Sequence, residues 1–541
     1  MTEARAGLAE VVDGGVAADT GGRSAWRPLR QPVFRLLWIA TVVSNVGSWM
    51  SDVGTSWTML MLNADPLWVA LVQAAGSLPM CLFALPSGVM ADIIDRRRYL
   101  LFSQCWVFAV AAGLSLLAAA GQVTPEILLA AAFLLSTGAA MSSPPFQAIV
   151  PDLVDKSELP AAVALNSLGV NISRAIGPAL GGGILSLAGP WAVFMLNALS
   201  VMGVGYVLYR WRTEPDARRL PPEHFFSAVR AGLRYVHAAP VLRNVLARAA
   251  AFFLFASAGW ALLPLVARRE LGLGPGGYGI LLASIGIGAI SGAMLLPRLR
   301  ARLDPDRLTA LASLLFALTM LALAYLRHFW LLTASEFFTG FAWIAVLSTL
   351  NIGAQRSAAR WVKARALAVY LTVFFGSMTL GSAVWGQLAS KVGISASLCS
   401  AAIAMMVAAV VALRWRLDKD ADLNLEAGEH PAPPEVVVAH EQGPVMVSIE
   451  YRIDPAQRRA FLAAVRDMRR VRRRGGALSW AVYEDVQSPG AFMEVFVIGS
   501  WIEHLRQHER HTVNDRLIQA RALAFHRGDA PPAVRHLLAP G

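Results

Sequence analysis

Long apolar stretches separated by short polar connections run through residues 31–416 of the chain. A helix that crosses a lipid bilayer needs about 20 consecutive, mostly apolar residues. A longer hydrophilic stretch at 211–248, part of which is expected to form short amphipathic helices, divides the candidate spans into six and six. This layout is typical of transporters built from two repeated halves. The twelve predicted spans cover residues 34–62, 67–91, 99–120, 126–148, 161–187, 190–209, 249–267, 278–296, 308–326, 329–350, 366–389 and 394–413.

The composition also favours a membrane protein. Of the 541 residues, 56% are hydrophobic and 16% are charged, and the mean hydropathy is +0.51. A soluble domain carries about 25% charged residues, so disorder is excluded for most of the chain and an ordinary soluble enzyme is disfavoured. The three cysteines lie in apolar runs and make no disulfide framework. Residues 1–30 lack the apolar core of a signal peptide and are expected to form a disordered cytoplasmic tail.

The net charge of +12, from 48 Lys and Arg against 36 Asp and Glu, follows the predicted topology. If the N-terminus is cytoplasmic, the loops that should be basic hold runs such as Arg96–Arg98 and Arg298–Arg307. The outward loops hold few basic residues, namely Arg268, Arg269, Arg327 and Lys391. This alternation satisfies the positive-inside rule and predicts that both termini are cytoplasmic. It also makes nucleic acid a poor explanation for the basic charge.

Three ionisable residues remain inside the predicted spans once loops and tails are set aside: Asp52, Arg174 and Glu336. Each would cost at least about 2.5 kcal/mol at the bilayer centre if it faced lipid. We therefore expect them to face the protein interior or a water-filled cavity. There they would form a substrate and coupling-ion site, with Asp52 or Glu336 taking up the proton. The alternative is a static ion pair between Asp52 and Arg174 that holds two helices together.

Polar and aromatic neighbours share the helical faces of these three charges. Asn45 falls on the polar face of the first span, Asn171 on that of the fifth and Trp343 on that of the tenth. These neighbours are expected to line the same pathway. Arg174 would either attract an anionic substrate group or keep Asp52 deprotonated until substrate binds.

The connection after the second span reads Gly88-Val-Met-Ala-Asp92-Ile-Ile-Asp95-Arg96-Arg97-Arg98. It resembles the signature of the major facilitator superfamily, Gly-x-x-x-Asp-Arg/Lys-x-Gly-Arg-Lys/Arg. The matching residues are Gly88, Asp92, Arg96 and Arg97, whereas Ile93 and Asp95 depart from the pattern. The resemblance implies a cytoplasmic charge network around Asp92 that holds the inward side closed, with one basic partner lost to Ile93.

The fifth span contains Ser173-Arg174-Ala-Ile-Gly177-Pro178-Ala-Leu-Gly181-Gly182-Gly183. Its core, Gly177, Pro178, Gly181 and Gly182, resembles the fifth-helix signature of the proton-coupled exporters of the superfamily, with Ser173 in place of a glycine. Small residues allow helices to approach closely, and proline allows a helix to bend. Ordinary small-residue packing in a membrane helix is the alternative interpretation.

The fifth and sixth spans together resemble one bacterial branch of the superfamily, the transmembrane secretion effectors, which includes the enterobactin exporter. The resemblance rests on Asn166, Asn171 and Arg174 before Gly-Pro, on Phe194 to Ser200, and on a soluble C-terminal extension. It implies a bacterial cytoplasmic (inner) membrane protein that exports a small siderophore-like or drug-like molecule with a proton gradient. We expect no cofactor and no metal.

The last hundred or so residues have a different pattern, and residues 417–443 form an acidic, proline-containing linker before them. Apolar and polar residues alternate from Val445 to Arg452, which predicts a half-buried strand. A helix capped by Asp454-Pro455 follows, then strands near 477–486 and 491–499, a helical region at 501–525 and a last strand at 534–538. The order β-α-β-β-α-β predicts a ferredoxin-like fold for residues 444–541.

This domain resembles the small antibiotic-biosynthesis monooxygenase domains, which pair as α+β barrels. The resemblance rests on Glu494, Trp501, His508 and His511. If it extends to function, Trp480, His508 or Asn514 would bind a polyaromatic ligand. The favoured interpretation is a dimerisation or regulatory module in which these residues hold the fold.

Two further features of this domain have alternative interpretations. His504, His508 and His511 lie at i, i+4 and i+7, a spacing that zinc uses, but a solvated helix face is favoured because no thiolate or carboxylate ligand is evident. The basic run Arg469–Arg474 would contact anionic headgroups or be a solvated helix end.

The sequence thus predicts an all-α membrane protein of twelve transmembrane helices, in a six-plus-six major-facilitator bundle, with a small C-terminal α+β ferredoxin-like domain. The expected function is proton-coupled export of a small molecule, and the expected partners are substrate, protons and the lipid bilayer. The rivals are a membrane-tethered monooxygenase and an importer of the same fold. The expected division is a tail at 1–30, bundles at 31–210 and 249–416 around a loop at 211–248, a linker at 417–443 and the domain at 444–541.

Overall fold

The computed structural model describes a helical bundle and a separate small sheet domain. The described residues are 26–63, 65–155, 157–211, 235–236, 239–359, 362–414, 416–417, 442–509, 512–528 and 530–539. Most of the hydrophilic stretch at 211–248, where short amphipathic helices are expected, and most of the linker lie outside these ranges.

The first half contains six long helices after a short 3-10 turn, η1 (Arg27–Arg30). Most begin with proline in the first turn, where the missing N–H costs nothing because it would have no helical partner. Side chains of Asp65, Asp95 and Thr124 cap three of them. The helices are α2 (Pro32–Leu62), α3 (Pro66–Ile93), α4 (Arg96–Ala119), α5 (Pro125–Leu153), α6 (Leu159–Ala188) and α7 (Pro190–Arg210).

The second half also contains six long helices, and the first of them continues into a π turn, η2 (Val266–Glu270). This first helix begins at Pro240, nine residues before the predicted limit, so Arg248 lies in a helix and not in the central loop. The helices are α9 (Pro240–Leu265), α10 (Pro275–Arg300), α11 (Pro305–Tyr325), α12 (Phe329–Arg356), α13 (Lys363–Val392) and α14 (Ile394–Ala412).

Among the described residues, eleven helices are long and apolar enough to cross a membrane. The twelfth long helix, α6, is not one of the eleven, since its asparagines, serines, arginine and glycines lower its hydropathy. The glycines among these residues also let α6 approach its neighbours closely.

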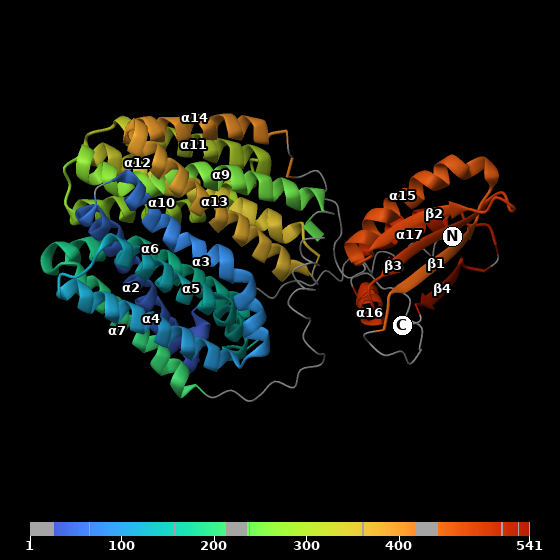
Figure 1. Cartoon of the computed structure of the whole chain (residues 1–541), viewed down its shortest axis with the longest axis horizontal. Helices are drawn as coiled ribbons and strands as arrows, with labels where there is room; N and C mark the ends of the chain where they lie inside the picture. The colour runs from blue at the N-terminus through green and yellow to red at the C-terminus, as the bar shows by residue number, and fades with distance from the viewer. Residues whose placement is uncertain are drawn as a thin grey trace, which may run out of the picture.

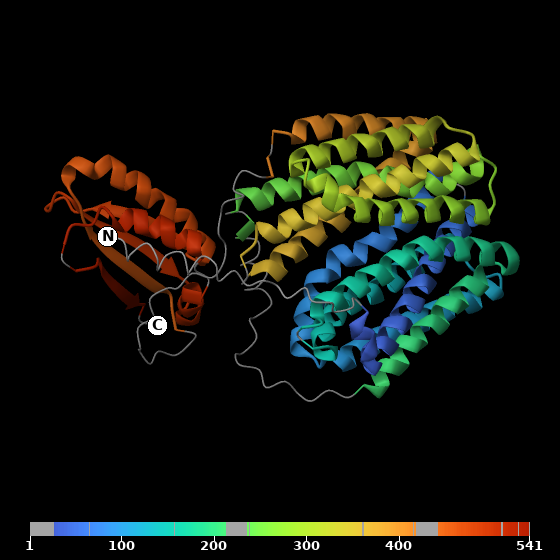
Figure 2. The ribbon, with the colours of Figure 1, turned by 180° about the vertical axis from the view of Figure 1, so that it is seen from behind.

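The two halves lie side by side with their helices running roughly along a common direction (Figures 1 and 2). They meet along two helix pairs, α3 with α13 and α6 with α10. We call the end of the bundle that carries η1, the α3–α4 connection and the end of α14 the domain-side end. The opposite end, which carries the α2–α3 connection and the start of α10, is the far end.

The C-terminal domain is a four-stranded antiparallel sheet with helices on one face (Figure 1). Its strands are β1 (Val445–Arg452), β2 (Ser479–Glu484), β3 (Ala491–Ile498) and β4 (Ala533–Leu538), in the order β2-β3-β1-β4. The register pairs Val447 with Phe496 and with His536. The order is compatible with the predicted ferredoxin-like arrangement, in which a crossover helix links β1 to β2.

The helices of this domain are α15 (Arg458–Gly475), α16 (Trp501–Glu509) and α17 (Val513–Leu523). The helical region predicted at 501–525 contains two helices, α16 and α17. Thr512 caps the start of α17 by exchanging hydrogen bonds with Asp515, a capping box that begins a new helix. The domain has a hydrophobic core of its own, centred on residues such as Tyr451, Phe461 and Phe496.

Candidate functional site

A cavity of about 380 Å³ lies between the two halves of the bundle. Helices α2, α3, α5 and α6 form one wall, and α9, α10, α12 and α13 form the other. The volume falls within the range of sites that bind small molecules. The lining residues are Trp49, Asp52, Val53, Thr55, Ser56, Val69, Val72, Gln73, Gly76, Ser77, Ala132, Leu135, Ser136, Arg174, Trp260, Ala261, Pro264, Tyr278, Leu282, Trp343, Leu347, Phe374, Phe375 and Met378.

The wall from the first half is polar and carries the only charges of the described lining. Asp52 is exposed to the cavity although it lies near the middle of α2. Gln73, Ser77 and Ser136 add uncharged polar groups from α3 and α5. A carboxylate so placed avoids the cost of facing lipid because the cavity admits water or substrate.

Arg174 reaches the same cavity from α6 but makes no ion pair with Asp52 in the described part of the chain. Its guanidinium lies over the ring of Trp49, with Cζ 5.6 Å from the ring centroid. Its Nε atom is buried and has no hydrogen-bond partner among the described groups. The alternative of a static Asp52–Arg174 pair is therefore not what the structure shows.

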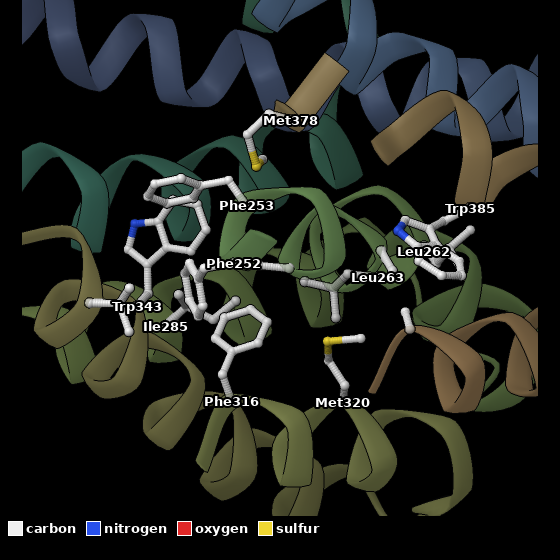
Figure 3. Close-up of a cluster of buried hydrophobic side chains, with 14 of the residues drawn as sticks. Phe252, Phe253, Leu262, Leu263, Ile285, Phe316, Met320, Trp343, Met378 and Trp385 are labelled. Atoms are coloured by element: carbon white, nitrogen blue, oxygen red, sulfur yellow. The ribbon is translucent and has the colours of Figure 1, made fainter. Parts of the chain in front are cut away.

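The wall from the second half is aromatic. Trp343 lies at its centre, with its ring centroid 5.3 Å from those of Trp260 and Phe253. Phe253 in turn packs edge-on against Phe374, at 4.2 Å. Figure 3 shows Trp343 beside Phe253 and Phe252, above a buried cluster that continues to Phe316. Such a surface accommodates a flat apolar molecule with little rearrangement.

Glu336 does not line this cavity. It is 2% exposed and borders a much smaller void of about 10 Å³, together with Thr339, Ile285 and Trp260. Trp260 borders both spaces and so lies between Glu336 and the cavity. The expectation that all three intramembrane charges converge on one space was wrong for Glu336.

Asn45 and Asn171 are also not among the cavity-lining residues. Asn171 is half-buried and donates a hydrogen bond to the backbone carbonyl of Ser167, 2.9 Å away, one turn back on its own helix. Asn45 is half-buried on α2, two turns from Asp52. Of the predicted pathway residues, the structure thus brings together Asp52, Arg174 and Trp343.

The cavity is closed at the far end by direct contacts between the halves. Trp57 of α2 stacks on Tyr278 of α10, with ring centroids 5.9 Å apart. The Ser390 hydroxyl of α13 donates to Asp65 at the start of α3, at 2.6 Å. These contacts cross from one half to the other, so they must break when the far end opens.

Comparison with known proteins agrees with this division into a helical bundle and a C-terminal domain. A family model described as "Transmembrane secretion effector" matches residues 23–540, which includes the C-terminal domain. The chain belongs to the transmembrane secretion effector family. The match covers nearly the whole chain, and it makes the chain a membrane transporter of the major facilitator type and not an enzyme.

Curated relatives of this transporter include efflux and siderophore transporters. Multidrug efflux pump Tap of Mycolicibacterium fortuitum is 24% identical over 71% of this chain and 95% of that protein. Enterobactin exporter EntS of Shigella flexneri is 26% identical over 59% and 75%. Staphyloferrin A transporter of Staphylococcus aureus is 30% identical, but over 28% of this chain and only 39% of its own length.

Solved structures support the fold. A bacterial homologue of the human lysosomal transporter Spinster, in an inward-facing and unoccupied conformation, aligns with a TM-score of 0.58 at 14% identity. The alignment covers 72% of this chain and 98% of that one.

The fifth-helix glycines of this transporter allow two helices to approach α6 closely. A Cβ atom on Gly177 would lie 2.5 Å from Trp49 Cβ, and one on Gly181 would lie 2.8 Å from Met50 Cα, both on α2. On the other side of α6, a Cβ on Gly182 would lie 2.5 Å from the carbonyl oxygen of Pro275 on α10. The Pro178 carbonyl would be 2.5 Å from a Cβ on Gly279. Gly182 and Gly279 therefore set the distance between the two halves at the far end, whereas Gly177 and Gly181 set the distance between α2 and α6 within the first half.

The structure describes the side chains of only part of the charge network predicted after α3. Gly88 and Asp92 lie in the last turns of α3, but the surroundings of Gly88 and the side chain of Asp92 are not described. Arg96 begins α4, and Arg97 donates to the carbonyls of Leu208, at 2.8 Å, and Tyr209. Arg97 thus caps the end of α7, where the helix dipole favours a cation.

Sequence reasoning missed a second arginine inside the bundle. Arg248 is 5% exposed and pairs with Asp306 of α11 at 2.6 Å. It also donates to the Thr309 hydroxyl, at 3.0 Å, and to the carbonyl of Ala412 at the end of α14. The residue had been assigned to the central loop because the start of α9 was placed too late. The polar residues before Arg248 obscure the start of α9 in the hydropathy pattern. Pro240, a residue favoured in the first turn of a helix, marks that start.

The C-terminal domain contains a buried polar group around Glu494, which is fully buried. Its carboxylate accepts hydrogen bonds from Arg472 Nε and Trp480 Nε1, both at 3.0 Å, and from the Tyr451 hydroxyl at 3.2 Å. Burial alone would lower the pKa of Arg472, but the charge and hydrogen bond of Glu494 raise it. The Trp480 indole therefore uses its N–H group within the domain, as expected if Trp480 stabilises the fold.

The histidines of α16 are not a solvated face, contrary to the favoured interpretation. His504 is 3% exposed, and its Nε2 lies 3.2 Å from Nε2 of the half-buried His508. His511 lies outside the described residues, and Asn514 is half-buried in the first turn of α17. His536, on β4, joins the pair with its ring centroid 4.7 Å from that of His504.

Proposed function

We propose that this transporter exports a small molecule from the cytoplasm in exchange for protons, with Asp52 as the proton-binding group. The observation that carries the proposal is the cavity between the halves, where an exposed carboxylate and a cation that makes no ion pair with the described residues face an aromatic wall. A purely structural carboxylate would be expected to lie against a partner, as Asp306 lies against Arg248.

The direction of transport rests on the charge of the connections. The positive-inside rule puts the domain-side end in the cytoplasm, since the basic connections lie there. The far end, which is closed in the structure, then faces outward. We infer that substrate enters from the cytoplasmic side and leaves when the Trp57–Tyr278 and Asp65–Ser390 contacts break.

The substrate class follows from the two walls. Asp52 favours a cationic or hydrogen-bond-donating group, and Arg174 favours an acidic or hydrogen-bond-accepting group. Trp260, Trp343 and Phe374 favour a flat, apolar body. Siderophore-like and drug-like compounds combine these features, and the names of the relatives support the same class.

Competition at Asp52 would couple the two fluxes. When the outward side is open, a proton neutralises Asp52 and weakens its hold on the donor group of the substrate, which leaves. When the cytoplasmic side is open, loss of the proton restores the charge and the affinity for substrate. A ligand shifts such an equilibrium only through its different affinity for the two states, which this competition supplies.

The test starts with a growth screen of an efflux-deficient bacterial host against siderophores, dyes and antibiotics. The compound that the chain protects against is then added to everted membrane vesicles that hold an acidic interior, with a fluorescent probe of the proton gradient. We expect the compound to release protons from wild-type vesicles and to accumulate inside them. The matched control is Glu126→Gln, which removes an exposed acid on α5 outside the cavity.

Two outcomes would contradict the proposal. Uptake by whole cells without accumulation in everted vesicles would show an importer. Accumulation that continues after the proton gradient is collapsed would show another energy source.

We also propose that the C-terminal domain folds independently and forms a dimer through its open sheet face. This face carries exposed apolar residues on all four strands: Met446, Tyr483, Met493 and Leu537. An exposed apolar face of this kind marks an interaction surface. Charged substitution at Met493 is expected to leave the domain folded and to abolish association of the full chain, measured by light scattering in detergent.

A further inference from the structure

Three histidines come together in the C-terminal domain from two distant parts of the chain. His504 and His508 lie one turn apart on α16, and His536 lies on β4. One ring nitrogen of each lies within 4.8 Å of those of the other two. The pairing of His536 with Val447, whose side chain is in the core, directs His536 toward the helix-covered face of the sheet.

The spacing of these nitrogens suits a metal ion. Zinc binds imidazole nitrogen at about 2.0–2.1 Å, so two such ligands in a tetrahedral shell lie about 3.3 Å apart. The Nε2 atoms of His504 and His508 are 3.2 Å apart, close to that value. His536 completes a three-nitrogen set after a small movement of its ring. Three imidazoles suit zinc and other late first-row metals better than magnesium or calcium.

The surroundings hold the rings in place. Trp501 packs against His504, with ring centroids 5.2 Å apart, and against His536 at 6.2 Å. His504 and Trp501 are both buried, so the side of the site toward the core is dry. The half-buried His508 and His536 lie toward solvent and leave a route for an ion.

We propose that His504, His508 and His536 bind one divalent transition-metal ion, with zinc as the best match, and that water fills the remaining coordination position. The ion would join α16 to the edge strand β4 of the sheet. No other described residue contributes a ligand to this set.

The position of the site suggests what the ion would affect. In both views α16 lies at the end of the domain that faces the helical bundle (Figures 1 and 2). Gln507 of α16 packs against Gly475 at the end of α15, and the neighbouring Arg474 pairs with Asp515. Burial raises the pKa of Tyr235, and the charges of Arg474 and Asp515 lower and raise it in turn. The Tyr235 hydroxyl hydrogen-bonds the α12–α13 connection at Ser357 and Ala359. A metal-bound α16 would thus stiffen the part of the domain nearest the transporter bundle.

The experiment uses the full chain, purified in detergent with a tag that contains no histidine and stripped of metal with a chelator. Zinc affinity is measured by competition with a chromophoric zinc indicator, and cobalt(II) is added in parallel to record its visible spectrum. The variants are His508→Ala and His536→Gln, both at half-buried positions. The matched control is His328→Gln, an exposed histidine at the start of α12.

We expect the wild type and the control to bind one zinc ion per chain and to give the intense visible bands of tetrahedral cobalt. Each variant is expected to lose more than about tenfold in zinc affinity, because even outer-sphere changes cost 10–100-fold. Circular dichroism and size-exclusion profiles identify any variant that fails to fold. As a second readout, added zinc should raise the melting temperature of the wild type and of the control but not that of the folded His508→Ala and His536→Gln variants.

Either of two results would overturn the proposal. One is a wild-type chain that does not compete with the indicator for zinc. The other is a folded His508→Ala or His536→Gln variant that binds zinc as tightly as the control.

Discussion

Two arginines inside the bundle, Arg174 and Arg248, differ in how their surroundings satisfy the charge. Arg248 is surrounded by acceptors: the Asp306 carboxylate at 2.6 Å, the Thr309 hydroxyl and a backbone carbonyl. Arg174 lies against the ring of Trp49, and its Nε has no hydrogen-bond partner among the described residues. The first arginine joins three helices of one half, whereas the second leaves its charge available to a cavity.

The energetics of the two sites differ in the same way. Removing one member of a buried pair leaves an uncompensated charge and is strongly destabilising. Arg174 makes no ion pair with the described residues, so its removal should cost little stability. The removal should instead lower the rate of transport. Two substitutions test this difference directly, and two more test the closed far end and the aromatic wall of the same cavity.

Arg248→Met is expected to have the largest effect, a loss of about 3–5 kcal/mol of stability, because Asp306 is left without its partner. Thermal unfolding of the detergent-purified protein measures it, with Arg248→Lys as the milder control. The double variant Arg248→Met, Asp306→Leu should recover much of the loss. A single variant that melts with the wild type would show that the pair is not structural.

Arg174→Gln is expected to leave the melting temperature unchanged but to reduce transport about 10- to 100-fold, the loss of a charged hydrogen bond to substrate of about 1.5–3 kcal/mol. Initial rates in everted vesicles measure it, and Arg174→Lys should retain part of the activity. If Arg174→Gln instead unfolds the protein as Arg248→Met does, the two arginines do not differ in kind.

Gly182→Val tests whether the far end must close. The new Cβ would lie 2.5 Å from a backbone oxygen of α10, which has no freedom to move away. Overpacking of this kind costs about 1–3 kcal/mol, and here it destabilises the state in which the far end is closed. In a background without the native cysteines, a Thr55→Cys reporter in the cavity should react several-fold faster with an impermeant thiol reagent added outside. Gly183→Val, where a Cβ meets nothing within 4 Å, is the matched control.

Trp343→Phe should have the smallest effect. A smaller ring keeps the aromatic wall but loses part of its contact with Trp260 and Phe253, about 0.5–1.5 kcal/mol. We expect a change of at most about tenfold in the KM for export and none in kcat. A complete loss of transport would indicate that Trp343 does more than line the cavity.

The sequence was sufficient for the architecture because the relevant signals are local. A run of about 20 apolar residues identifies a span wherever its partners lie, and the alternation from Val445 to Arg452 identifies a strand in the same way. Asp52 and Arg174 were found by subtraction, since a charge inside a span must avoid lipid.

What the sequence could not supply depends on contacts between distant segments. Glu336 and Asp52 are both acidic residues inside predicted spans, so the sequence does not distinguish them. In the structure, Trp260 lies between Glu336 and the cavity that Asp52 lines. The partners of Glu494 come from three other elements of the small domain. His536 stands alone in a short strand, and only the pairing of β4 with β1 brings it to His504.

The central claim is that Asp52 exchanges a proton for the substrate within the cavity. It is tested most directly by substrate-induced proton release from everted vesicles that contain Asp52→Asn, with Asp52→Glu as the control that keeps a carboxylate. We predict that Asp52→Asn folds and reaches the membrane, binds substrate more weakly and releases no protons, while Asp52→Glu retains coupling. Proton release from Asp52→Asn at the wild-type rate would contradict it.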